Sequence, residues 1–291
     1  MIKERLREYA ETADKYLDKY LPVKDNPQKI IYEAMRYSVF AGGKRLRPAL
    51  MMGACEMCGG KIENVMPFAC AMEMIHTYSL IHDDLPAMDN DDLRRGRPTS
   101  HIKYGEAVAI LAGDALLNRA FEVVSGAKGD AERILRALSI LSLSSGTEGM
   151  IGGQVIDMEC EGKEITLDEL RLMHSGKTGA IIRSSCVIGC LLGGGNDAEL
   201  AAVDEFAKNL GIAFQIQDDI LDVEGSEEEL GKPIGSDAAE NKNTYVSILG
   251  IEKAKELMIE YSEKAKRALL PFGYKADFLI GLTDYLTARR S

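Results

Sequence analysis

Apolar residues recur along most of the chain at intervals of three and four residues, which places them on one face of an α-helix. The run Ile30, Ile31, Ala34, Met35 and Val39 shows this spacing. No segment alternates apolar and polar residues between hairpin turns, so the pattern does not predict a sheet. We therefore expect an all-α protein in which residues 1–291 form a single domain of about ten helices.

Prolines and capping residues mark where the predicted helices begin. Pro27, Pro48 and Pro67 each stand near the first turn of a helix, and Thr166 with Glu169 forms a capping box. Beyond residue 100, helices are predicted at residues 105–125, 130–160, 166–192, 197–222, 244–270 and 275–289. Residues 224–243 show the weakest pattern and are rich in Glu, Gly and Asp, so we expect a flap over a site there.

Composition narrows the class of ligand. The net charge of -11 argues against nucleic acid as the general partner, because a phosphate backbone requires a broad basic surface. The basic residues at 44–47 and 94–97 form short clusters, which indicates small anionic ligands. The charged N-terminus lacks the apolar core of a signal peptide, and no run reaches the roughly 18 apolar residues of a membrane span, so we expect a cytoplasmic protein. Buried free thiols are expected at Cys55, Cys58, Cys70, Cys160, Cys186 and Cys190.

One connecting segment, residues 82–98, contains a cluster of acids followed by three arginines. Carboxylates this close repel one another unless a cation lies among them, and oxygen atoms are the ligands that Mg²⁺ selects. Pro86 should end the preceding helix near Asp84, which puts Asp89 on a loop. On a continued helix Asp89 would lie about 240° round from Asp83, so the two can share a ligand only if the chain turns. The arginines indicate a second anionic partner.

A second acidic cluster, Asp218, Asp219 and Asp222, closes the helix predicted at 197–222. Acids at a helix C-terminus oppose the helix dipole, and the apolar run before them indicates a largely buried helix. Cations facing both clusters would remove this conflict; the alternative is a solvated helix end. Lys177 with Thr178, and Gln215, are polar positions on otherwise apolar helices, and each alone could be a satisfied core group.

Taken in order, these motifs resemble those of the trans-isoprenyl diphosphate synthases, and most closely the bacterial farnesyl diphosphate synthases. The residues that carry the resemblance are 42–48, Asp83 and Asp84 with Asp89, 94–96, and Asp218 and Asp219 with Asp222. The resemblance covers nearly the whole chain, from Tyr32 to the region of Thr244. The four-residue gap between Asp84 and Asp89 is the form found in bacterial farnesyl and plant geranylgeranyl synthases.

This resemblance implies the isoprenoid synthase fold, a bundle of mostly antiparallel helices around a central cavity, and a prenyltransferase that works as a homodimer. The enzyme would condense isopentenyl diphosphate with dimethylallyl or geranyl diphosphate to give farnesyl diphosphate and pyrophosphate. About three Mg²⁺ ions, for which Mn²⁺ can substitute, would assist ionisation of the allylic diphosphate. The implied metal-binding residues are Asp83, Asp89 and Asp218, supported by Asp84, Asp219 and Asp222.

The resemblance also assigns substrate-binding residues. Those for isopentenyl diphosphate would be Lys44, Arg47, His76 and Arg95, with Phe214 along its hydrocarbon part. Those for the allylic diphosphate would be Arg94, Lys177, Lys232 and Lys242, with Thr178 and Gln215 facing the allylic cation. Lys177, Thr178 and Gln215 are thus the predicted catalytic residues, and the released pyrophosphate would accept the final proton.

Product length is expected to depend on the helix that precedes Asp83. Tyr78, five residues earlier, is bulky, and in the family an aromatic residue at that position closes the cavity at the farnesyl length. Ser79, four residues earlier, lies nearer the path of the growing tail by helical angle. Geranyl (C10) and geranylgeranyl (C20) diphosphate are the alternative products.

Three other classes of protein fit part of the pattern. A terpene cyclase also ionises allylic diphosphates, but it would not need a second diphosphate site at Lys44, Arg47, His76 and Arg95. A non-catalytic partner subunit typically lacks one acidic motif, and this chain has both. A calcium-binding EF-hand beginning at Asp89 would place Arg94 where a glycine is required and Ser100 where a glutamate is required.

Overall fold

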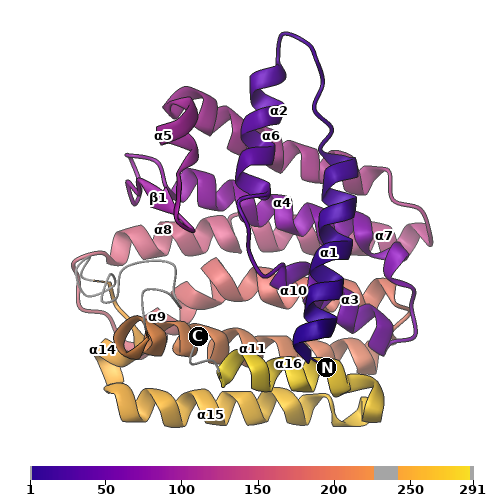
Figure 1. Ribbon diagram of the computed structural model, residues 1–291. Helices are drawn as coiled ribbons and strands as arrows, with labels where there is room; N and C mark the ends of the chain where they lie inside the picture. Colours follow the sequence, from indigo (N-terminus) through magenta and orange to yellow (C-terminus); the bar gives the residue numbers. More distant parts are fainter. Residues whose placement is uncertain (1, 226–241, 289–291) are drawn as a thin grey trace.

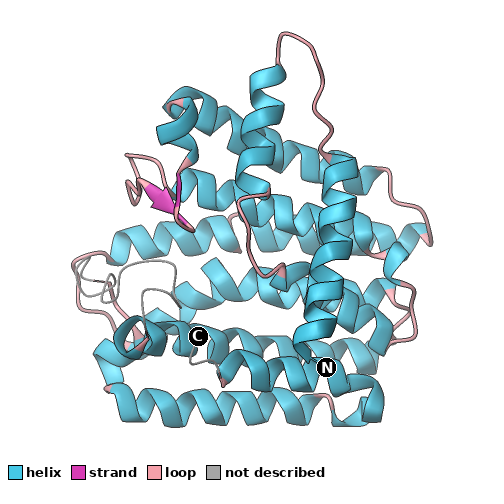
Figure 2. Cartoon of the chain, in the orientation of Figure 1, coloured by secondary structure: helices cyan, strands magenta, loops and turns pink. Residues whose placement is uncertain are grey.

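The computed structural model describes residues 2–225 and 242–288, and these are almost entirely helical (Figure 1 and Figure 2). The first half contains α1 (Ile2–Tyr20), α2 (Lys29–Val39), α3 (Leu46–Met57), η1 (Ile62–Asn64), α4 (Met66–Asp83), β1 (Leu93–Arg94), β2 (Arg97–Pro98), α5 (Ser100–Tyr104), α6 (Glu106–Ser125) and α7 (Ala131–Ser145). The second half contains α8 (Met150–Cys160), α9 (Leu167–His174), η2 (Ser175–Gly179), α10 (Ala180–Leu192), α11 (Asp197–Glu224), α14 (Tyr245–Leu249), α15 (Ile251–Ala268), η3 (Leu270–Ala276) and α16 (Asp277–Thr287). The all-α prediction is confirmed.

The position of each helix follows from the width of its apolar face. α1 buries Leu6, Tyr9, Ala13 and Leu17, which recur every three or four residues and form a single stripe, so α1 lies on the outside. α4 is apolar on all sides and most of its residues are buried, so it lies inside the bundle. α4 packs against α6, α3 against α10, and α11 against α15. The helix that leads into the acidic loop also contacts α1, α2, α3 and α10, so several helices hold it in place.

The helices surround one large core, to which elements from α1 to α16 contribute side chains. A smaller apolar cluster lies between α9, α11, α14 and α15 and contains Leu170, Ile216 and Tyr245. In Figure 1, α1 and α2 stand upright across helices that run from side to side.

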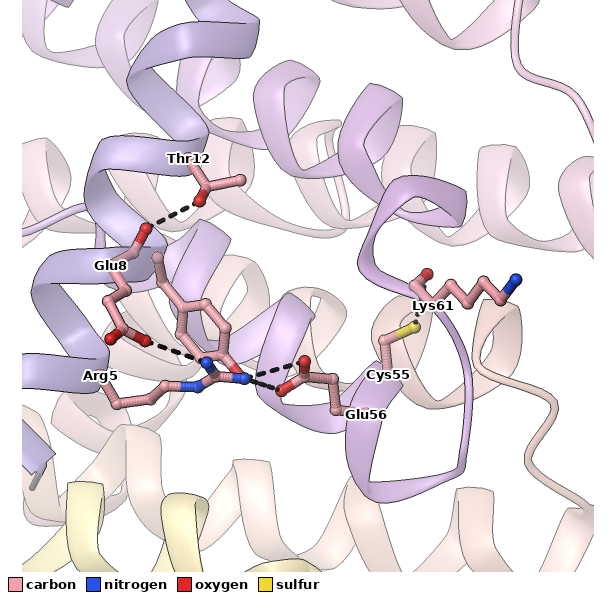
Figure 3. A network of polar contacts seen from close by, with 7 residues as sticks. Arg5, Glu8, Thr12, Cys55, Glu56 and Lys61 are labelled. Atoms are coloured by element: carbon pink, nitrogen blue, oxygen red, sulfur yellow. Dashed lines mark hydrogen bonds and ion pairs between the residues drawn. The ribbon is translucent and has the colours of Figure 1, made fainter.

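A polar network ties α1 to α3 at the edge of the core (Figure 3). Arg5 of α1 donates to both carboxylate oxygens of Glu56 on α3, at 2.9 and 2.7 Å, and also bonds Glu8 at 3.0 Å. Tyr9 donates its hydroxyl to the same Glu56, and burial together with that carboxylate raises the pKa of Tyr9 above its usual range. The first helix is thus attached to the bundle by charged contacts as well as by apolar packing.

The structure differs from the predicted elements at two breaks and one irregular turn. The helix predicted at 130–160 is two helices, because the link contains Gly149, where a Cβ would lie 2.1 Å from the carbonyl oxygen of Ser144. The helix predicted at 244–270 is interrupted by Gly250, which has a φ of +79°. The helix predicted at 166–192 is continuous but contains a π-helical turn, η2.

The prediction that the chain has no strands was wrong at one place. β1 and β2 form a two-stranded antiparallel hairpin in which Leu93 pairs with Pro98 and Arg94 with Arg97. Its turn residues, Arg95 and Gly96, both have positive φ, at 53° and 71°. Two central residues with positive φ are typical of the tight turns that join hairpins. The hairpin was missed because two residues per strand are too few to show alternation.

The prediction of buried free thiols is confirmed for four of the six cysteines. All six are free, and Cys55, Cys70, Cys186 and Cys190 are buried, whereas Cys58 and Cys160 are partly exposed. Within the described ranges, none of the helices is both long enough and apolar enough to cross a bilayer.

Candidate active site

The acidic loop begins where α4 ends, at Asp83, next to the predicted position. The backbone N–H of Asp89 donates to the carbonyl oxygen of Asp83 at 2.8 Å, so the chain folds back on the end of the helix. Asn90 follows with a φ of 54°, a left-handed conformation that Asn tolerates better than most residues. The turn that Asp83 and Asp89 need in order to share a ligand is therefore present.

Asp83 is a carboxyl group in an unfavourable position. Burial raises its pKa to about 6, with nearby Asp89 and Asp84 acting in the same direction and Lys177 and Arg94 in the opposite direction. A carboxylate that is taken out of water requires a positive partner to stay charged. A cation at the end of α4 would therefore stabilise the charged form of Asp83.

The hairpin places Arg94 against Asp84. The Arg94 Nε donates to Asp84 Oδ1 at 2.6 Å, its second nitrogen lies 2.5 Å from the same oxygen, and Asp91 lies 3.4 Å away. Asp84 is 3% exposed. In this arrangement the arginine predicted to bind the allylic diphosphate is held by two acids of the same loop.

The second acidic cluster is not a solvated helix end. α11 continues past it to Glu224, and Asp219 and Asp222 are only 3% and 2% exposed. Asp219 accepts hydrogen bonds from Gln215 Nε2 at 3.0 Å and from the backbone N–H of Tyr245, at the start of α14, at 2.8 Å. Asp219 thus joins α11 to α14, a role that sequence reasoning missed.

The acids of the loop fit a divalent cation by their chemistry. They offer carboxylate oxygens, which hard cations such as Mg²⁺ prefer, and burial of Asp83 beside Asp84 and Asp89 is a conflict that a cation would relieve. In residues 2–225 and 242–288, however, no three His, Cys, Asp or Glu side chains form a ready-made metal cluster. The acids therefore supply candidate ligands from separate positions.

A basic group of side chains lies at the other end of the same helix face. Burial, with Arg95 acting in the same direction and Glu73 and Asp218 opposing it, lowers the pKa of Arg47 to about 10. Burial and the nearby Arg47, Arg95 and Arg94 keep the pKa of His76 well below its usual range, so its imidazole is neutral at pH 7. The Arg95 guanidinium lies against Gly43, where a Cβ would be 2.4 Å from one of its nitrogens. Three arginines around a neutral histidine favour an anionic ligand.

Arg45 fixes the loop that carries Lys44 and Arg47. Its backbone is left-handed, with a φ of 48°, and its side chain is buried. The guanidinium bonds Asp14 of α1 at 2.7 Å, Glu73 of α4 at 2.9 Å and the carbonyl oxygen of Val39 at 2.7 Å. Three helices thus hold one arginine that lines neither cavity and fixes the loop of its neighbours, a role that sequence reasoning did not assign.

Lys177 lies in the π-helical turn η2, packed closely on α8. A Cβ on Gly153 of α8 would be 2.1 Å from the backbone nitrogen of Lys177, so the two backbones are in contact. The Lys177 Nζ lies 2.5 Å from Asp157 Oδ2. A π-turn inside a helix commonly marks a functional position, and here it carries both Lys177 and Thr178.

These features converge on a cavity of about 340 Å³. The predicted site residues that line it are Arg47, His76, Tyr78, Ser79, Asp83, Lys177 and Thr178. Arg94 and Arg95 line a small adjoining cavity with Asp84. Other predicted residues line neither cavity as the described residues form it, namely Lys44, Asp89, Phe214, Gln215, Lys242 and the acids of α11. Lys232 lies outside the described residues.

The apolar wall of the cavity was not predicted. It contains Met88, Met150, Ile151, Val155, Met158 and Ile181, with Gln154 between them. Ile151, Val155 and Met158 follow one face of α8 and are 42%, 50% and 44% exposed. Their helical spacing was visible in the sequence, but nothing in it distinguished a cavity wall from core.

A larger cavity, of about 1040 Å³, lies beside α8, η2 and α11. It shares Ile151 and Val155 with the smaller cavity but contains none of the predicted site residues. Volume alone would favour it, but the acids, the arginines and the π-turn converge on the smaller cavity, which is therefore the candidate active site.

Comparison with known proteins agrees with this chemistry. Residues 28–269 match the polyprenyl synthetase family. The chain is 51% identical over 292 residues to a chloroplastic geranylgeranyl pyrophosphate synthase of Capsicum annuum, covering 99% of this chain and 79% of that protein. It is 48% identical over 273 residues to a farnesyl diphosphate synthase of Geobacillus stearothermophilus, covering 92% and 91%. The crystal structure of a geranylgeranyl pyrophosphate synthetase from Pyrococcus horikoshii matches with a TM-score of 0.91 and 34% identity, covering 99% and 98%.

Proposed function

The chain belongs to the polyprenyl synthetase family and is a short-chain prenyltransferase, and we propose that its product is farnesyl diphosphate. The observation that supports this product is the position of Tyr78, which is 5% exposed and lines the cavity one turn below Asp83. A hydrocarbon tail that grows from the diphosphate end along α4 meets this ring. Geranylgeranyl diphosphate is the second candidate, because relatives with either name match at similar identity.

In this proposal the two substrates occupy opposite ends of the cavity. Arg47, His76 and Arg95, with Lys44 on the adjoining loop, bind isopentenyl diphosphate. The neutral His76 can donate a hydrogen bond without adding to the repulsion among the arginines. Arg94, Lys177, Lys232 and Lys242 bind the allylic diphosphate, and Phe214 contacts the isopentenyl hydrocarbon.

Enzymes of this family use a divalent metal to ionise the allylic diphosphate. We propose about three Mg²⁺ ions, with Mn²⁺ as a substitute, which neutralise the charge of the departing pyrophosphate. Asp83, Asp89 and Asp218 would hold them, with Asp84, Asp219 and Asp222 in support.

The chain's own groups prepare this site before substrate binds. Lys177 forms an ion pair with Asp157, and Arg94 forms one with Asp84. When a diphosphate binds, its oxygens replace these carboxylates as partners of the two cations. Thr178 and Gln215 offer side-chain oxygens to the developing cation, and the double bond of isopentenyl diphosphate attacks it. The carbocation formed by this attack then loses a proton to the released pyrophosphate, which leaves a new double bond in the product.

We also propose that residues 1–291 form one synthase domain, because a single core includes side chains from α1 to α16. A homodimer is supported by exposed leucines on α6 and α7. A cytoplasmic location stays a prediction.

Replacement of one acid tests the proposed chemistry. We expect Asp83→Ala to abolish turnover, because it removes the carboxylate at the end of α4 that lines the cavity, while circular dichroism shows an intact fold. Asp92→Ala, an exposed acid of the same loop, is the matched control and should retain activity. Incorporation of labelled isopentenyl diphosphate measures both, and full activity in Asp83→Ala would contradict the proposal.

Replacement of the cavity aromatic tests the product. We expect wild-type enzyme to make the C15 product and Tyr78→Ala to shift it towards C20, because the methyl group leaves space where the ring ended the tail. Tyr78→Phe keeps the ring and should keep the C15 product. Chromatography of dephosphorylated products distinguishes these outcomes, and an unchanged chain length in Tyr78→Ala would exclude Tyr78 as the limit.

A further inference from the structure

The ring of Tyr78 has no polar anchor. Its hydroxyl is buried and finds no hydrogen-bond partner among the described residues. Burial and nearby Asp83 raise its pKa to about 12, so the group stays neutral. The orientation of the ring therefore depends on what packs against it.

The neighbour that packs against Tyr78 is His82, one helical turn further along α4. The two rings are edge to face, with centroids 5.7 Å apart and planes at 74°. Aromatic pairs in this geometry hold each other beyond their simple burial, by about 0.5–1.5 kcal/mol. Both rings line the cavity.

His82 is itself fixed on α6. Its Nε2 lies 3.1 Å from the carbonyl oxygen of Ile110, which can only accept, so the imidazole donates from Nε2. The same edge of the ring lies on Gly113, where a Cβ would be 2.2 Å from Nε2. Any other residue at position 113 would occupy the space of the imidazole.

We propose that His82, seated on Gly113 and bonded to Ile110, is a positioning residue that holds Tyr78 across the cavity and so sets product length. This inference rests on the proposed role of Tyr78 as the limit. The product is then determined by a contact between α4 and α6 and not by the aromatic residue alone. A family member with Tyr at the position of Tyr78 but without the glycine at the position of Gly113 would stop the growing hydrocarbon tail at a different length.

Two variants alter the contact in opposite ways. His82→Ala removes the support, so the Tyr78 ring gains freedom and the share of C20 product rises severalfold. Gly113→Ala places a methyl group where Nε2 lies, so the imidazole leaves α6 for the open volume beside it, which is the cavity. The tail is then stopped earlier and the share of C10 product rises. The crowded atoms are the tip of a flexible side chain, so Gly113→Ala retains the fold.

The experiment incubates each purified enzyme with dimethylallyl diphosphate and labelled isopentenyl diphosphate and measures the C10, C15 and C20 products. Gly126→Ala, at the far end of α6 where a Cβ has room, is the matched control and should give the wild-type distribution. In Tyr78→Ala, adding His82→Ala should lengthen the product no further, because the support acts through the ring. A purely structural role would change turnover or melting temperature without changing this ratio.

The outcomes separate this inference from the proposed product. A wild-type enzyme that makes mainly C20 contradicts the farnesyl proposal, while the shifts relative to wild type still decide the role of His82. If Tyr78→Ala lengthens the product but His82→Ala and Gly113→Ala leave it unchanged, the inference is overturned alone. It is also overturned if Gly113→Ala lengthens the product, if His82→Ala adds to Tyr78→Ala, or if His82→Ala is inactive and Gly113→Ala makes wild-type products.

Discussion

In the basic half of the site, the pKa values and hydrogen-bond partners of single side chains could not be predicted from the sequence. The sequence marks His76 as a group that titrates near neutral pH, whereas in the fold it is buried among arginines and its pKa is well below 6.5. The sequence likewise predicted Arg47 as a ligand but gave no sign that its Nε would be buried without a partner among the described residues. Burial and neighbours come from tertiary packing, which a list of motifs does not contain.

The lowered pKa of His76 makes stability depend on pH. The unfolded chain binds this proton near pH 6.5 and the folded chain only at lower pH, so stability is complete above about 6.5 and falls as pH decreases. We expect His76→Gln, which has no imidazole to take up this proton, to lose less stability than the wild type between pH 7.5 and 5.5 in urea titrations. Parallel losses in the two proteins would contradict this.

Helices and their ends were the most predictable part of the fold, and close backbone contacts the least. The end of α4 and the capping box at Thr166 follow from local chemistry, so they were predicted correctly. The break before α8 and the hairpin at Arg95 lie in segments too short to show a period. The π-turn at Lys177 lies against Gly153, a glycine on another helix. A local sequence pattern predicts that a helix or strand forms. It does not predict how closely the backbone of another element packs against it.

The contact between α8 and the π-turn gives a prediction of this kind. Gly153→Ala would push α8 away from Lys177, so we expect a loss of about 1–3 kcal/mol in stability and a raised KM for the allylic diphosphate. Gly211→Ala, on the opposite side of the turn, places its Cβ at an ordinary 3.4 Å from Gly179 and is the control. Denaturant titration and steady-state kinetics measure both effects, and equal behaviour of the two variants would exclude a positioning role for the contact.

Across the whole molecule, the sequence offered candidate site residues but not their positions in space. Seven predicted residues line one cavity, and they come from α3, α4 and η2. Their convergence could not be read from spacing, because residues 47, 83 and 177 are brought together only by the packing of α3 and α4 against α10. Asp219 shows the converse, since a predicted metal ligand also bonds the start of α14.

The outer surface carries a prediction about assembly. Leu135 and Leu143 are 67% and 62% exposed on the side of α7 opposite its buried residues. If this side contacts a second copy, Leu135→Glu with Leu143→Glu should reduce the mass in light scattering from twice 31.9 kDa to that of one chain. Leu270→Glu, an exposed leucine on η3, should leave the mass unchanged. A dimer that survives the double replacement would place the interface elsewhere.

The ion pairs of Arg45 connect the loop of Lys44 and Arg47 to a helix that lies outside the cavity. α1 contributes no side chain to the cavity, yet its Asp14 is one of the two carboxylates that neutralise the buried guanidinium. A chain trimmed of this outer helix would lose no ligand, but it would leave a buried cation half compensated and the loop of Lys44 and Arg47 without one of its three attachments. The leading helix therefore supports the loop of the proposed isopentenyl diphosphate site, and shortening it should weaken substrate binding before it unfolds the bundle.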